Sequence, residues 1–331
     1  MSTAYCASMM LLGSACSQDD NAPGQPSPEV PVAESLPRTL TPVATEGFEQ
    51  PGDAVSSHDG ARFYFTGIVT REEEKLPAVL TVPASGGEPE TLASGAPFGQ
   101  LSGLVMGCND AILYVADLGA VADPNTDPEV DSGTEPDLPP GALFRLEVST
   151  GEVVRLGARE IESPTGIALS DDCESLYVTG TDSAGAPALF SLPRSGGPVR
   201  VILSGDPLIA PTGLHVDKDG VAWVMDHLAE GEQGAGVLFA IDNEGTATEV
   251  MSDLRMGTPG GVSLNSSGST AFMPTIDEDG AGRLTSISLL TSEVVHIPAP
   301  DLTDPAGIRT ARHASVFAVV DAENHTIYRA E

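Results

Sequence analysis

Short apolar runs recur along most of the chain, and residues typical of tight turns separate them. The copy that begins at Pro211 shows the pattern clearly, with apolar runs at 214–216, 222–225, 237–241 and 248–251. The segments 217–220 (DKDG) and 242–245 (DNEG) between these runs have the composition of β-turns. Runs of this length with such turns between them predict short antiparallel strands.

A Pro-x-Gly step precedes the first apolar run of each copy and marks where the copies begin. Clear examples start at Pro164, Pro211, Pro259 and Pro305, and degenerate ones start at Pro51 and Leu101. The intervals between these starts are 50, 63, 47, 48 and 46 residues, the longest containing an insertion. Four strands in each period of about 40–50 residues are typical of a β-propeller blade. The sequence therefore predicts an all-β, six-bladed β-propeller with four antiparallel strands per blade.

The last copy stops after three apolar runs, so its outermost strand must come from elsewhere. Residues 39–43 precede the first Pro-Gly step, just as 90–92 precede the second. We therefore predict that the N-terminal strand, at about 39–43, completes the last blade and closes the ring, which removes an open seam. The competing interpretation, two smaller β domains, would need a mid-chain linker, and none is visible.

The residues before the repeats have the pattern of a targeting segment rather than of a part of the propeller. Residues 3–15 are apolar or small, too short a stretch to span a bilayer and typical of a signal peptide. The segment before Cys16 resembles a degenerate bacterial lipobox, which implies lipidation of Cys16 in a 1–16 signal peptide. Ser17 after it suggests retention at the outer membrane. The alternative is a soluble protein with an apolar tail. Residues 17–36 are rich in Pro, Ser and acid and predict a disordered tether, leaving 37–331 as the propeller.

Composition supports this fold and excludes some partners. The 331 residues include 36 Gly and 27 Pro, and only 5% are aromatic, which favours many short strands joined by turns. Against 48 acidic residues there are 15 Lys and Arg, a formal net charge of −33. Such acidity argues against nucleic acid and against an anionic lipid surface, so membrane contact is expected only through an N-terminal lipid anchor. Acidity also keeps secreted proteins soluble, independently of any partner.

One face of the predicted ring collects the irregular loops. Loops that enter the first strand and loops that join the second to the third strand share that face, and binding residues usually lie on such loops. The longest, 117–141, carries oxygen donors at Asp123, Asn125 and Asp127, which resembles a Ca²⁺ loop in part. The expected cofactors are therefore none, or Ca²⁺ or another divalent metal. The alternative for 117–141 is a solvated acidic loop.

Two further sets of side chains are candidates on the loop face. The residue after each blade-start Pro or Leu should point to the channel mouth, and Ser102, Thr165 and Thr212 place hydroxyls there as candidate ligand-binding residues. The alternative is that small residues fit a crowded rim. His227 lies beside Asp226 and is the candidate for acid–base chemistry, against the alternative of a solvated loop histidine.

Cys108 and Cys173 lie in the predicted turns between strands one and two of neighbouring blades. In an extracytoplasmic compartment such a pair is a disulfide candidate, provided that the Cα atoms come within about 7 Å. Two buried free thiols are the alternative.

The final copy carries the motif that allows a family comparison. Its 319–329 segment, VVDAENHTIYR, resembles the NHL-repeat signature, and the blade pattern of 37–331 is similar to six-bladed NHL and senescence-marker/gluconolactonase-like proteins. The enzymes among these bind a divalent metal through Glu, Asn and Asp. Thr165 and Thr212 occupy such positions here, and only Glu46 or Glu49 could supply the carboxylate, so the ligand set is incomplete.

The resulting expectation is an extracytoplasmic, monomeric propeller, lipid-anchored at the outer membrane or periplasmic or secreted. It binds a small molecule, a cation or a basic protein surface through an acidic loop face, without evident catalytic machinery. The alternatives are a metal-dependent lactone or ester hydrolase or a lyase at the channel mouth, and a structural envelope component. Whether the chain is an enzyme stays open at this point.

Overall fold

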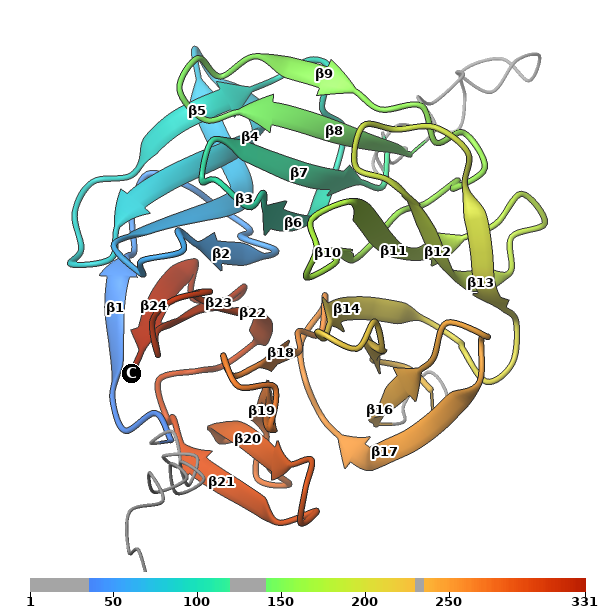
Figure 1. The fold of residues 1–331 in the computed structure, drawn as a ribbon. Coiled ribbons are helices and arrows are strands. Elements are labelled where there is room, and N and C mark those ends of the chain that lie inside the picture. The colour runs from blue at the N-terminus through green and yellow to red at the C-terminus, as the bar shows by residue number, and fades with distance from the viewer. Residues whose placement is uncertain (1–35, 120–140, 230–234) are drawn as a thin grey trace, which may run out of the picture. The chain divides into compact units, whose positions relative to one another are not determined.

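Six four-stranded antiparallel sheets form a ring in the computed structural model, which describes residues 36–119, 141–229 and 235–331 (Figure 1). No helix occurs in these ranges. The strands of blades one to three are β2 (Ala54–Ser56), β3 (Arg62–Arg71), β4 (Glu74–Pro83), β5 (Glu90–Ser94); β6 (Leu101–Met106), β7 (Ile112–Asp117), β8 (Ala142–Glu147), β9 (Val153–Arg155); β10 (Ile167–Leu169), β11 (Ser175–Thr181), β12 (Pro187–Pro193), β13 (Arg200–Ser204).

Blades four and five repeat this order, and blade six combines strands from both ends of the chain. The strands are β14 (Pro211–Val216), β15 (Ala222–Asp226), β16 (Gly236–Ile241), β17 (Ala247–Leu254); β18 (Ser263–Leu264), β19 (Thr270–Ile276), β20 (Gly282–Ser288), β21 (Val294–Pro298); β22 (Pro305–Thr310), β23 (Phe317–Asp321), β24 (Thr326–Ala330), β1 (Leu40–Ala44). The predicted propeller, with four strands in each of six blades, is therefore confirmed.

The N-terminal strand closes the ring as predicted. Strand β1 pairs antiparallel with β24, with Leu40 opposite Ala330 and Thr41 opposite Arg329. Figure 1 shows β1 on the outer edge of the blade formed by β22, β23 and β24. Leu36, which the sequence assigns to the tether, already packs against the core between blades five and six.

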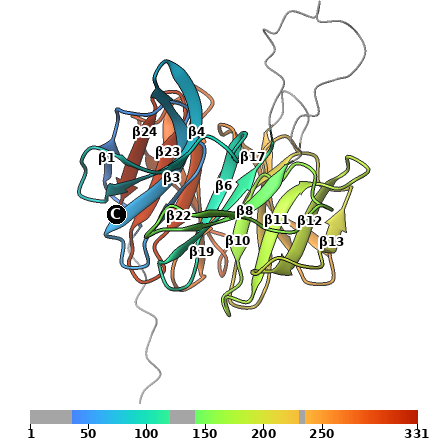
Figure 2. The same ribbon diagram turned by 90° about the horizontal axis from the view of Figure 1, so that it is seen from above.

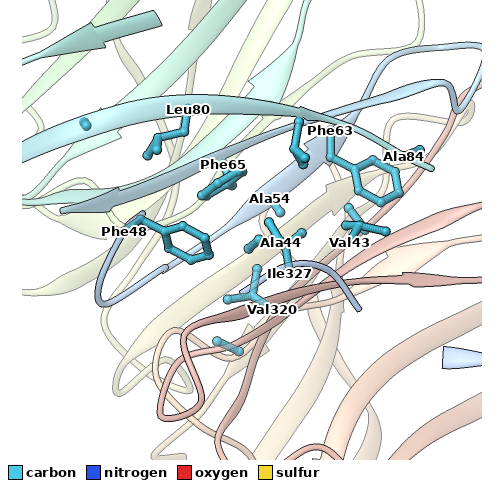
Figure 3. Packing of buried hydrophobic residues seen from close by; sticks show 14 of the residues in the cluster. Val43, Ala44, Phe48, Ala54, Phe63, Phe65, Leu80, Ala84, Val320 and Ile327 are labelled. Atoms are coloured by element: carbon cyan, nitrogen blue, oxygen red, sulfur yellow. The ribbon is translucent and has the colours of Figure 1, made fainter. Parts of the chain in front are cut away.

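The hydrophobic core is divided among the interfaces between neighbouring blades. Each of the six buried clusters combines side chains of two adjacent blades, and one of them joins blade one to blade six. In that cluster, Phe63 and Phe65 of β3 face Val320 and Ile327 of blade six, with Val43 of β1 beside them (Figure 3). Burial at the blade interfaces therefore stabilises the closed ring as a unit.

The Pro-x-Gly steps repeat because adjacent blades approach each other closely at the channel. A Cβ atom on Gly103 would lie 2.6 Å from the carbonyl oxygen of Thr165, the equivalent step of the next blade. A Cβ on Gly261 would lie 2.8 Å from the carbonyl oxygen of Ala306. Only glycine leaves room for this backbone contact, so the repeat observed in the sequence is a packing requirement of the ring.

Strands of every blade run between two faces of the ring, as the view turned by 90° shows (Figure 2). One face carries the loops that enter first strands and the loops between second and third strands. We call it the loop face. The other face carries the turns between first and second strands and between third and fourth strands. We call it the turn face.

Candidate functional site

A cavity of about 680 Å³ opens on the loop face. The blade-start steps, including Ser102, Thr165 and Thr212, line its inner part, and Lys75, Glu323 and His325 are among the residues farther out. We call this cavity the funnel. The three hydroxyl residues selected from the sequence are thus brought together in one concave surface, which is the usual setting of a binding site.

The three hydroxyl groups also connect neighbouring blades. Ser102 Oγ donates to the carbonyl of Pro164 at 3.0 Å, Thr165 Oγ1 to that of Pro211 at 2.7 Å, and Thr212 Oγ1 to that of Gly260 at 3.1 Å. Each acceptor belongs to the step of the next blade. With their hydrogens used in this way, the hydroxyls offer a ligand only the lone pairs of their oxygens.

Asp226 and His227 are both held against the segment that enters their own blade. The Asp226 carboxylate is fully buried and accepts the N–H groups of Ile209 at 2.6 Å and Ala210 at 2.9 Å. The His227 ring contacts the same segment, with Nδ1 3.0 Å from the carbonyl oxygen of Ala210.

The same arrangement recurs at the ends of the second strands of blades two and six. Asp117 accepts the N–H groups of Gly99 and Gln100, and Asp321 accepts that of Thr303. Asp226 is therefore one of a repeated set that fixes the loop entering each of these blades. The sequence signal was visible, because Asp ends the second apolar run in the same three copies.

Charged side chains of blades six and one line part of the funnel. Asp304 and Glu323 come from blade six, and Lys75 comes from the β3–β4 hairpin, with its ammonium 2.6 Å from the Glu49 carboxylate. That hydrogen bond, together with the Lys75 charge, lowers the pKa of the exposed Glu49 carboxyl. Glu49 is one of the two residues that could have supplied a metal-binding carboxylate, and here it is paired with a lysine.

Asp304 differs from the other carboxylates of the loop face. Its side chain is half-buried, and the described residues donate no hydrogen bond to it. Burial raises the pKa of Asp304, and the Asp321 and Glu323 carboxylates raise it further. A positively charged group placed here would relieve the repulsion among the three carboxylates. Sequence reasoning missed Asp304 because its exposure depends on the neighbouring blade.

The channel below the funnel is closed by a buried ion pair. Arg309 of β22 lies 3.3 Å from the Asp53 carboxylate and crosses the channel to donate to the carbonyls of Ile167, at 3.1 Å, and of Leu214. The free space beside this pair is only about 10 Å³. Burial raises the pKa of Asp53, and the Arg309 charge and two backbone N–H groups oppose that rise. The signal that could have indicated this pair was an Asp directly before the first strand of blade one and an Arg within the first strand of blade six.

On the turn face, Cys108 and Cys173 are joined in a disulfide between blades two and three, with their Cα atoms 6.2 Å apart. Arg312 reaches this bridge from blade six, with Nη1 3.1 Å from the Cys108 sulfur, and its Nη2 donates to the Asp171 carboxylate at 2.8 Å. The side chain therefore crosses the ring to the opposite blade.

Acidic residues are spread over both faces. Several act in turns: Asp182 and Asp277 on the loop face and Asp217 and Asp242 on the turn face each accept two backbone N–H groups of their own turn. Charge alone therefore does not select the loop face as the binding face.

The predicted metal ligands Asp123, Asn125 and Asp127 lie outside the described residues, as does Cys16. Within the described ranges, no three His, Cys, Asp or Glu side chains come together in a way that could hold a metal ion. In the same part of the chain, no helix is long and apolar enough to cross a membrane.

Comparison with known proteins supports the architecture. No protein-family model matches the chain, and no curated protein matches it in sequence. Solved structures with a similar fold include a chain of a nidogen/laminin complex, 14% identical with a TM-score of 0.54, over 81% of this chain and 84% of that one.

Two bacterial structures are similar to the same extent. TolB from Acinetobacter baumannii is 14% identical with a TM-score of 0.54, over 76% of this chain and 55% of TolB. A structural-genomics protein of unknown function from Bacteroides thetaiotaomicron is 13% identical with a TM-score of 0.57, over 88% of this chain and 72% of that one. At these identities the likeness defines the class of fold, a six-bladed β-propeller, and nothing about activity.

Proposed function

We propose that this chain is an extracytoplasmic binding protein that recognises a cationic group of a small molecule or of a basic protein surface in the funnel. The observation that carries the proposal is Asp304, a half-buried carboxylate with no hydrogen-bond donor among the described residues, next to Glu323 in a cavity of about 680 Å³. An amine or guanidinium group would supply the missing donors and offset the carboxylate repulsion.

The location is part of the same proposal. The apolar N-terminal stretch and Cys16 suggest a lipid anchor, and the Cys108–Cys173 disulfide supports an oxidising compartment. We propose the NHL-repeat and senescence-marker/gluconolactonase-like superfamily as the family context, on the basis of the 319–329 motif. The propeller in a nidogen/laminin complex offers an analogy for a protein partner.

Binding rather than catalysis is the function favoured by the contacts of the funnel. The hydroxyls of Ser102, Thr165 and Thr212 donate to backbone carbonyls rather than to a base, which a nucleophile would require. The Asp226 carboxylate and the His227 ring are likewise engaged in hydrogen bonds with backbone groups of residues 209–210.

The test is titration of the purified protein with spermidine and with a labelled arginine-rich peptide at low and moderate salt. We expect binding that weakens as salt rises, and a loss of about tenfold or more in affinity for Asp304→Asn, since hydrogen bonds to charged groups contribute about 1.5–3 kcal/mol. The matched control is Glu278→Gln, an exposed acid on the same face that does not line the funnel. Equal losses of affinity in both variants would mean that the overall negative charge of the protein causes the binding, and would contradict the proposal.

A further inference from the structure

A second cavity, of about 210 Å³, lies on the turn face. The constriction at Arg309 and Asp53, where the free space is only about 10 Å³, separates it from the funnel. A molecule in this cavity therefore does not reach the funnel, and binding there is a function beyond the one proposed above.

The cavity is built from one repeated position of the blades. This position lies two residues after the Gly of each Pro-x-Gly step, or after Asp53, which replaces that Gly in blade one. It pairs with an equivalent residue of the second strand, as Ala168 does with Tyr177 and His215 with Trp223. All six residues at this position line the cavity: Val55, Val105, Ala168, His215, Ser263 and Arg309.

The order of these six residues around the ring gives the cavity two unlike sides. Blades one to three, which are consecutive, contribute the apolar side chains of Val55, Val105 and Ala168. Blades four to six contribute the polar side chains of His215, Ser263 and Arg309. A ligand that matches both sides has an apolar body and a polar end.

The charges around the cavity are already paired, which favours an uncharged ligand. The three basic residues of the lining each form an ion pair: Arg309 with Asp53, Arg312 with Asp171, and Lys218 with Asp219. Asp217, the other acid of the lining, accepts from the Trp223 indole and from two N–H groups of its own turn. The charge of Asp217 also acts on the nearby Lys218, whose pKa it raises together with Asp219. An ion that entered this space would lose hydration without gaining a free counter-charge.

His215 supplies a hydrogen-bond donor on the polar side. Desolvation by burial, followed by the Arg309 charge, lowers the pKa of the ring to about 3, so the ring is neutral at physiological pH. Nδ1 accepts from the N–H of Leu264 at 3.5 Å, which leaves the ring proton on Nε2.

The proton on Nε2 of His215 is open to a ligand. Within the described ranges, the buried side-chain nitrogens and oxygens without a partner are Nε of Arg309 and Nε of Arg329. Nε2 of His215 has no acceptor there either, and since it is not among these buried atoms, it is not sealed off by protein. Because the ring lines the cavity, an acceptor in that space can reach its N–H group.

The volume limits the size of the ligand. An apolar cavity of about 150 Å³ can hold benzene, so about 210 Å³ is enough for one ring with a short substituent. We propose that the turn-face cavity binds a small uncharged molecule, with its apolar body against blades one to three and a single hydrogen-bond acceptor at Nε2 of His215.

Four probes with the same ring test this proposal on the purified full-length protein by isothermal titration: benzyl alcohol, toluene, benzoate and benzylamine. We expect benzyl alcohol to bind most tightly and toluene, which has no acceptor, to bind about fivefold more weakly. The two ions should bind at least about tenfold more weakly than benzyl alcohol. No binding of benzyl alcohol, or an ion that binds as tightly, would overturn the proposal. Equal binding of toluene would contradict the hydrogen bond to His215.

The first variant tests the polar side of the cavity. His215→Leu removes the ring donor, so the affinity for benzyl alcohol should fall about fivefold, to that for toluene, while toluene binding stays unchanged. A merely structural role of His215 would weaken the binding of both probes equally, and that result would contradict the assignment.

The second variant tests the apolar side. Val105 is only partly buried, and Val105→Phe should fill the space that the ring of the ligand occupies, weakening benzyl alcohol and toluene at least about tenfold. The matched control is Val201→Phe, at an exposed position of β13 that does not line the cavity, and it should leave both affinities unchanged. Unchanged affinities in a folded Val105→Phe protein, or equal losses in the control, would show that the probes bind elsewhere.

Discussion

Thr39 and Glu331 lie 292 positions apart in the sequence, and two reciprocal backbone hydrogen bonds join them. The Thr39 N–H donates to the Glu331 carbonyl at 3.1 Å, and the Glu331 N–H donates to the Thr39 carbonyl at 3.2 Å. Both ends of the described propeller therefore belong to one sheet, and opening the ring requires this sheet or a blade interface to separate.

The first prediction concerns this closure. Val43→Ala on β1 should lower the free energy of unfolding by about 1.5–2.5 kcal/mol, because Val43 is buried against Phe63 and its neighbours. Thr41→Ala on the exposed side of the same strand should change it by less than about 0.5 kcal/mol. Urea unfolding measures both. Equal effects would mean that β1 packing contributes little to closure.

The inter-blade hydroxyls give a second prediction. Thr212→Val keeps the side-chain shape but removes the hydrogen bond to the Gly260 carbonyl, so stability should fall by about 1 kcal/mol. Thr248→Val, an exposed threonine on β17 of the same blade, is the control and should be nearly neutral. If Thr212→Val is equally neutral while ligand affinity falls, the hydroxyl serves binding rather than the ring.

Asp226 is expected to act on stability. Asp226→Asn leaves only one acceptor in a buried side chain for the N–H groups of Ile209 and Ala210 and should cost about 2–4 kcal/mol in the free energy of unfolding. Asp279→Asn, on an exposed turn of the same face, should cost almost nothing. A fully stable Asp226→Asn protein that has lost a turnover reaction would instead support the acid–base role considered from the sequence.

Stability should depend on pH through His215. Because its pKa is about 3 in the folded state and near 6.5 when unfolded, the unfolded chain binds the extra proton in that window. The contribution of His215 to the free energy of unfolding is therefore fully present above pH 6.5. It falls as pH decreases, by up to about 1.4 kcal/mol per pH unit. Comparing unfolding of the wild type and His215→Leu from pH 7.5 to 4.5 isolates the effect. Parallel pH profiles for the two proteins would contradict it.

The disulfide allows a chemical test. With Cys108 and Cys173 bonded, denatured but unreduced protein should show neither residue labelled by a thiol reagent. Replacing both by Ala should lower the free energy of unfolding by about 2–4 kcal/mol. A reducing agent should then destabilise the wild type but leave the double variant unaffected. Labelling of both residues without reduction would show that the thiols are free in solution.

The architecture could be predicted from local sequence patterns. The period between blade starts, the four apolar runs in each copy and the missing strand of the last copy predicted six blades and their closure by the N-terminal strand, and all of this is confirmed. These features are readable because blade formation depends on local alternation and turn chemistry, which each copy of the repeat carries for itself. The Pro-x-Gly steps were readable too, although their reason, the contact of Gly103 with Thr165, required the neighbouring blade.

Which side chains meet depends on how the six blades assemble around one axis. The sequence selected Thr165, Thr212 and Asp226 as candidates, but their partners, which satisfy them with backbone groups, lie in other blades or loops. Asp304 and the pair of Asp53 with Arg309 went unnoticed for the same reason, since burial and charge proximity arise when blades from distant parts of the chain converge on one axis. A repeat defines its own strands, whereas a site at the centre of a ring is a property of all six copies together.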